Sequence, residues 1–181
     1  MKAFALPLCA GLFLAALPAT ADDVSDTLKS ALEAYEAGDI QYAMEEIAFA
    51  QQLLKEMKAD SLTAFLPEAP DGWTREIDTE MAATLGMLGG GVGTKASYSD
   101  GSDSFTLTLM ADNPMVAAMG SAGLMGGKMI RVGREKFADQ DGQLIALIGN
   151  RVLVQAEGQN KEAMRALLET MDFRALASFG Q

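Results

Sequence analysis

The sequence of 181 residues contains no histidine and one cysteine, Cys9. Because Cys9 lies within the first 21 residues, a chain that loses those residues has neither a thiol nor an imidazole. Ser-His and Cys-His nucleophile systems, zinc sites of ordinary composition and histidine-ligated haem all need one of these groups. Intramolecular disulfide bonds are excluded as well. These two absences remove the commonest hydrolytic and metal-dependent chemistries.

Basic residues are also scarce. The chain has 14 Lys and Arg against 25 Asp and Glu, a formal net charge of -11 at pH 7. Nucleic acids and anionic lipid surfaces are bound through cationic surfaces, so the composition argues against both as partners. We also expect no stable membrane span, because the longest uncharged apolar stretch after residue 21, residues 114–127, is short and interrupted by glycine.

The first 21 residues have the pattern of a secretory signal peptide. Lys2 precedes an apolar run over residues 3–17, and the small-x-small sequence Ala19-Thr20-Ala21 follows. We therefore predict cleavage after Ala21 and a periplasmic location for the mature chain.

Residues 22–66 predict a helical hairpin. Apolar residues recur at steps of three and four in both halves, and Gly38-Asp39 between them suits a helix end followed by a helix cap. We expect the apolar stripes to meet in the seam and the ten acidic residues to face away from it. The turn and the small packing residues are Tyr35, Gly38-Asp39, Ala43, Ile47 and Ala50. In these positions the segment resembles a single tetratricopeptide unit, which implies a protein partner. The alternative is a hairpin that docks on its own domain.

Residues 67–72 form a linker with two prolines and a glycine, and residues 73–181 predict a second domain. Period-two patterns indicate strands at 73–77, 94–99, 105–109, 128–138, 144–148 and 152–156. Asn113-Pro114 and Asn160 each indicate the start of a helix. The turns between strands are too short for parallel crossovers. The sequence therefore predicts an α+β fold, in which an N-terminal αα-hairpin precedes an antiparallel sheet with helices packed on one face.

Methionine and glycine concentrate between residues 81 and 129. Methionine is common where one surface must fit varied apolar partners. We therefore predict a pliable apolar site for a hydrophobic ligand or a protein partner, against the alternative of a soft core beside a loop. The candidate residues are Met87, Leu88, Met115, Met119, Leu124, Met125 and Met129. A second hypothesis treats the thioethers as Cu(I) ligands.

No motif specifies a catalytic centre or a cofactor. Gly91–Ala96 matches a loose dinucleotide-binding pattern, but a strand and not a helix is expected after it. Carboxylates are abundant, yet their spacing selects no acid–base pair. We expect no cofactor, no resident metal and no catalytic residue. The leading hypothesis is a non-catalytic binding or assembly factor, and the alternatives are a methionine-only Cu(I)-handling protein and a small carboxylate-dependent enzyme.

Three short motifs extend over most of the chain after residue 65. They are Leu66-Pro67-x-x-Pro70-x-Gly72-Trp73, Asp112-x-Pro114-Met115, and Gly149-Asn150-Arg151-Val152-Leu153-Val154-x-x-Glu157-Gly158. In these motifs the chain resembles a family of uncharacterised proteobacterial periplasmic proteins, a resemblance that implies a location but no activity. The order of predicted elements also resembles Mog1/PsbP-type modules, which implies a binding or assembly role.

Overall fold

The computed structural model describes residues 20–78, 90–113 and 127–180, with side chains from Asp23 onward. The chain separates into two compact units, Met1–Ala50 and Gln51–Gln181. The sequence suggests a boundary at the linker 67–72, whereas these units meet within a helix that runs through both of them.

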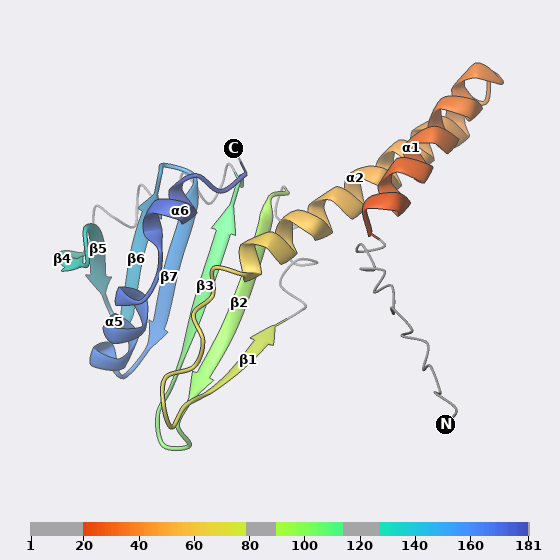
Figure 1. The fold of residues 1–181 in the computed structure, drawn as a ribbon. Coiled ribbons are helices and arrows are strands. Elements are labelled where there is room, and N and C mark those ends of the chain that lie inside the picture. The colour runs from red at the N-terminus through yellow and green to blue at the C-terminus, as the bar shows by residue number, and fades with distance from the viewer. Residues whose placement is uncertain (1–19, 79–89, 114–126, 181) are drawn as a thin grey trace, which may run out of the picture. The chain divides into compact units, whose positions relative to one another are not determined.

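The first unit contains an antiparallel pair of helices, α1 (Thr20–Glu36) and the first part of α2 (Ile40–Thr63) (Figure 1). Gly38 lies between them at a φ of +84°, a conformation that glycine adopts without steric cost. The Asp39 carboxylate accepts the backbone N–H of Tyr42 at 3.1 Å and so caps α2. The predicted helical hairpin is confirmed, and the Gly-Asp pair is its turn.

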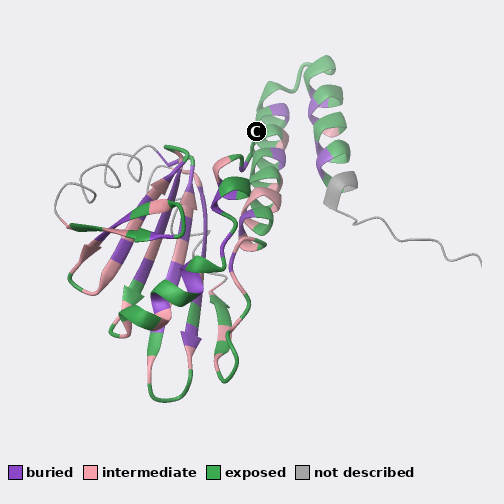
Figure 2. Ribbon diagram, turned by 60° about the vertical axis from the view of Figure 1, so that its left-hand side comes forward, coloured by how far each residue is buried: buried purple, intermediate pink, exposed green. Residues whose placement is uncertain are grey.

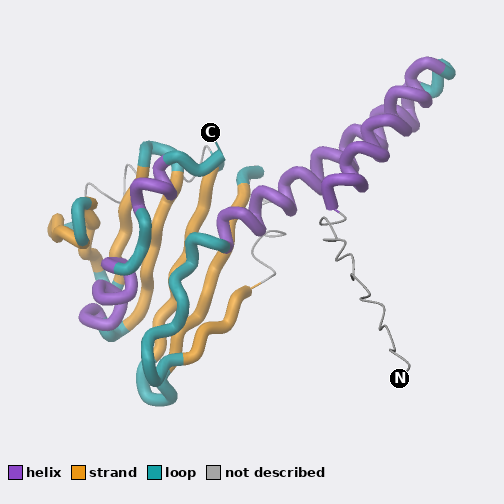
Figure 3. The backbone as a smooth tube through the Cα atoms, viewed as in Figure 1, coloured by secondary structure: helices purple, strands orange, loops and turns teal. Residues whose placement is uncertain are grey.

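The second unit is built on a seven-stranded sheet in the order β1-β2-β3-β7-β6-β5-β4 (Figures 1 and 3). The strands are β1 (Thr74–Asp78), β2 (Val92–Ser99), β3 (Ser104–Ala111), β4 (Lys128–Val132), β5 (Glu135–Gln140), β6 (Gln143–Ile148) and β7 (Val152–Gly158). All six neighbouring pairs are antiparallel. The α+β class predicted from period-two patterns and short turns is confirmed.

One predicted strand is wrong. Residues 128–138 form two strands, β4 and β5, which pair with each other around Gly133-Arg134. Gly133 has a φ of +58°, as a two-residue hairpin turn requires. The buried face lies at an even-numbered position in β4, Val132, and at an odd-numbered position in β5, Phe137. The prediction of one continuous strand overlooked this change of phase at the turn.

Two helices lie on one face of the sheet, α5 (Lys161–Glu169) and α6 (Phe173–Ala177) (Figures 1 and 2). The Asn160 side chain accepts the backbone N–H of Ala163 and caps α5, as predicted. Asp172 caps α6 in the same way, and α6 is a helix that the sequence did not predict. The core between helices and sheet is apolar and includes the fully buried Leu107, Leu109, Val154, Met164 and Leu168.

Candidate functional site

The segment after α2 is held by polar contacts to its backbone carbonyls. Arg75 donates Nη1 hydrogen bonds to the carbonyls of Leu66 and Pro67, each at 3.0 Å. The Tyr98 hydroxyl donates to the same Pro67 carbonyl at 2.7 Å. Burial raises the pKa of Tyr98 to about 12, although the neighbouring Arg75 opposes the shift. Arg75 also donates an Nη2 hydrogen bond to Glu68 at 2.9 Å, so these contacts together hold the loop after α2 in place.

Aromatic rings continue the same cluster. Trp73 and Tyr98 each pack against Phe105, with ring centroids 5.2 Å apart in both pairs. The Leu66–Trp73 motif therefore connects the end of α2 to the first three strands.

A second polar cluster surrounds Asp112. Its carboxylate accepts hydrogen bonds from Lys58 Nζ and Arg151 Nη2, both at 2.6 Å. Partial burial disfavours the charged carboxylate, but the hydrogen bonds and charges of Lys58 and Arg151 outweigh it and lower the pKa of Asp112. This cluster joins α2, the end of β3 and the β6–β7 turn. Because two cations share one carboxylate within the second unit, it is a bracing contact.

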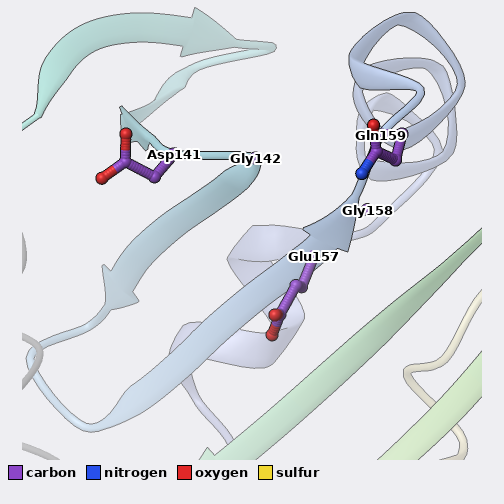
Figure 4. A pocket seen from close by; sticks show the side chains of 5 residues that line it. All are labelled: Asp141, Gly142, Glu157, Gly158 and Gln159. Carbon is purple, nitrogen blue, oxygen red and sulfur yellow. The ribbon is translucent and has the colours of Figure 1, made fainter.

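A small polar hollow lies where the β5–β6 turn meets the end of β7 (Figure 4). Its volume is about 380 Å³, and it is lined by Asp141, Gly142, Glu157, Gly158 and Gln159. Figure 4 shows the side chains of Asp141 and Glu157 pointing in different directions and not toward one another. A hollow with this lining suits neither a hydrophobic ligand nor the paired carboxylates of an acid–base mechanism.

Of the predicted glycine- and methionine-rich site, only Met129 falls within the described residues. It lies in β4 and is 47% exposed. The remaining candidates lie outside the described residues: Met87, Leu88, Met115, Met119, Leu124 and Met125.

The helical hairpin has an unusual seam. Its buried residues are mostly small. Five of them are at most 8% exposed: Thr27, Ala31, Ala34, Ala43 and Ala50. In Figure 2 the buried parts of α1 lie on the side turned toward α2. Small side chains allow two helices to approach closely, so the seam itself has no room for large residues.

The large apolar side chains of this hairpin point outward instead. Eight of them are between 45% and 64% exposed: Leu28, Leu32, Tyr35, Ile40, Tyr42, Met44, Ile47 and Phe49. An amphipathic hairpin ordinarily buries its large residues and exposes its small and polar ones. The expectation that the apolar stripes meet in the seam is therefore wrong for these residues.

Six of the eight lie on one side of the hairpin. Each residue advances 100° around a helix. By this measure, three of the exposed residues of α1 lie clockwise of the buried residues of α1, and three of the exposed residues of α2 lie clockwise of the buried residues of α2. In an antiparallel helix pair, matching sides are adjacent. We call these six residues the apolar face: Leu28, Leu32, Tyr35, Ile40, Met44 and Ile47. Tyr42 and Phe49 lie on the opposite side.

The signal that would have found the apolar face is the spacing of the alanines. Ala43 and Ala50 are seven residues apart, and Ala31 and Ala34 are three apart, as residues of one helix-helix seam should be. Treating all apolar residues as equivalent merged this narrow seam with the stripe beside it.

Comparisons with protein-family models, curated proteins and solved structures found no match. In the described part of the chain, no group of three or more acidic, histidine or cysteine side chains is arranged to hold a metal ion. Within the same ranges, no helix is both long enough and apolar enough to cross a bilayer. The apolar face is therefore the candidate functional site.

Proposed function

We propose that this chain is a non-catalytic binding or assembly protein that docks a protein partner through the apolar face. The observation that carries the proposal is that six large apolar side chains, 45% to 64% exposed, lie together over an alanine seam. Contiguous apolar patches above a few hundred Å² are rare on monomers and mark interaction sites. Covering each half-exposed side chain contributes about 1 kcal/mol, so a partner that covers all six gains several-fold more.

The alternatives have less support among the described residues. The polar hollow offers a hydrophobic ligand no apolar wall, and its two carboxylates do not face each other. Of the methionines considered for Cu(I), Met129 alone is described, and it lies on a strand. The apolar face, in contrast, is made of residues that the structure describes throughout.

We further propose that the protein works in the periplasm. Support comes from the leader pattern over residues 1–21 and from the resemblance of the motifs between Leu66 and Gly158 to periplasmic proteins. After cleavage at Ala21 the chain has no thiol, so an oxidising compartment has nothing to oxidise there except methionine.

Site-specific photo-crosslinking in the cells that make the protein tests the docking proposal. A photoreactive residue replaces Leu32, on the apolar face, or Glu33, which follows it and points away from both the face and the seam. We expect one discrete protein adduct from position 32 and none from position 33. Equal adducts from both positions, or none from position 32, would contradict docking through this face.

A further inference from the structure

The apolar face is regular. In an antiparallel hairpin, residues at about the same height along the two helices have nearly the same sum of residue numbers, here 75 or 76, and the six residues fall into three such levels. Tyr35 with Ile40 forms the level nearest the turn, Leu32 with Met44 the middle one, and Leu28 with Ile47 the last. Each level has one large side chain from each helix. A two-fold axis through the middle level exchanges the two outer ones.

We infer that the partner of the apolar face is a second copy of this chain, an inference that rests on the proposed function. Two copies would meet face to face, with α1 antiparallel to α1 of the other copy and with Leu32 and Met44 at the axis. Such a contact is isologous, which is the commonest arrangement of soluble homo-oligomers.

The area of the apolar face is sufficient for this contact. Six half-exposed large side chains present on the order of 600 Å² per copy, or about 1,200 Å² for a pair, which reaches the range of stable interfaces. The face is also richer in apolar residues than most transient interfaces, as homodimer contacts are. The polar residues at its ends, Ser25 and Gln51, are uncharged.

The charges beside the face are complementary to a second copy. Lys29 and Glu36 flank the α1 side of the face, three residues before Leu32 and four after it. A two-fold axis through Leu32 therefore brings Lys29 opposite Glu36 of the second copy, and the symmetry repeats the pair. The existing pair of Lys29 with Asp26 does not oppose this, because both side chains are at least 70% exposed and such pairs contribute little.

The rest of the boundary offers no repulsion. On the α2 side, the residues beside the face are Gln41 and Ala48, and the same axis brings these two opposite each other. The remaining acidic residues of the helices, such as Glu33 and Glu45, lie farther round from the face. At physiological ionic strength, charges more than about 8 Å apart in solvent are largely screened.

Sedimentation equilibrium of the purified protein over a range of concentrations tests the inference. We expect a monomer–dimer equilibrium, and we expect the double substitution Leu32→Ser with Met44→Ser to raise the dimer dissociation constant at least about 100-fold. The matched control is Tyr42→Ser with Phe49→Ser, which removes two exposed aromatic side chains from the opposite side of the hairpin. This control should change the dissociation constant less than about threefold. Equal effects of the two double substitutions would overturn the inference.

A charge exchange tests the two-fold geometry. Lys29→Glu places two carboxylates opposite each other, and Glu36→Lys places two ammonium groups opposite each other, so each should raise the dissociation constant about tenfold. The two substitutions together restore opposite charges and should return it to within about threefold of the original value. Additive weakening in the double variant would reject the predicted pairing.

The two proposals can fail separately. A protein that stays monomeric at 100 µM in roughly physiological salt, but forms an adduct with a different protein from position 32, would refute the second-copy inference and leave the docking proposal standing. A monomer without an adduct from position 32 would refute both. An adduct with the mass of two copies, lost in the Leu32→Ser and Met44→Ser variant, would support both.

Discussion

At the scale of single residues, the polar contacts of the second unit explain why particular side chains occur in the sequence motifs. The Pro67 carbonyl accepts from both Arg75 and Tyr98, and Asp112 accepts from both Lys58 and Arg151. In each case one acceptor meets two donors from other parts of the chain. Because each acceptor keeps a second donor or access to solvent, removing one partner should cost about as much as an average hydrogen bond contributes.

Replacing Tyr98 by Phe should lower the free energy of unfolding by about 1 kcal/mol at pH 7, since the Pro67 carbonyl keeps Arg75 as a donor. The substitution should have a larger effect on the free energy of unfolding at high pH. The folded pKa of about 12 lies above the ordinary tyrosine pKa of 10.0, so the contribution of Tyr98 is complete below pH 10 and is lost as the pH rises toward 12. Urea unfolding between pH 9 and 11.5 should show a shallower alkaline loss for Tyr98→Phe than for the parent protein. Identical slopes would show that Tyr98 does not titrate as its burial predicts.

Replacing Asp112 by Asn tests the ionic contact without changing the backbone preference. Asp112 has a φ of +57°, which asparagine tolerates as well as aspartate does. We expect a loss of about 1 kcal/mol at pH 7, because the contact is partly exposed to solvent. The lowered pKa means that this contribution is present above the ordinary aspartate pKa of 3.8 and is lost as the pH falls through the folded pKa. Thermal unfolding at pH 7 and pH 3 should therefore differ less in Asp112→Asn than in the parent, and an equal difference would contradict this account.

At the scale of elements, the hairpin depends on small residues in its seam. A narrow seam brings α1 and α2 close together, and the large side chains then lie on the flanks, where they are available to a partner. The hairpin can therefore be stable although many of its large apolar side chains are exposed, because the two helices pack against each other through alanine.

Enlarging a seam residue should separate the helices. We expect Ala43→Leu to destabilise the hairpin by about 1–3 kcal/mol, because an added isobutyl group has no space in a seam where Ala43 is 4% exposed. The matched control is Ala48→Leu, the same change at an exposed position of the same helix. Hydrogen exchange of the α1 and α2 amides should accelerate in the first variant only. Equal protection in both variants would show that the seam is not closely packed.

At the scale of the whole molecule, one acidic chain contains a helical hairpin and a sheet unit that differ in how they bury their apolar side chains. The sheet unit has an extensive apolar core and braced polar contacts, whereas the hairpin exposes more large apolar side chains than it buries. The larger buried core is therefore in the second unit, and the first unit has the exposed apolar face that we propose binds a partner.

The proposed periplasmic location concerns the whole chain, and N-terminal sequencing tests it. Protein recovered from the periplasm should begin at Asp22, because Ala19-Thr20-Ala21 is the small-residue cleavage site. Replacing Ala21 by a bulky residue such as Phe should slow the removal of the leader, and Asp26→Asn, beyond the cleavage site, is the control. Protein that retains Met1 and fractionates with the cytosol would contradict the predicted location.

Much of the fold was predictable because its determinants are local. Hairpin turns such as Gly149-Asn150, the caps Asp39 and Asn160, and alternation along the strands depend only on neighbouring residues. The turn at Gly133 was missed because the prediction treated residues 128–138 as one strand, although the buried position changes from even-numbered Val132 to odd-numbered Phe137 across it. The apolar face was missed because hydrophobicity alone does not distinguish a leucine in a seam from one beside it.

By itself, the sequence determined the absence of histidine, the acidic balance, the α+β class and the existence of the hairpin, because composition and short-range periodicity carry that information. Only the tertiary structure decided which apolar residues are buried. The close approach of two alanine-lined helices leaves Leu32 and Met44 outside the seam. Their exposure follows from the packing of one helix against the other, not from either helix alone.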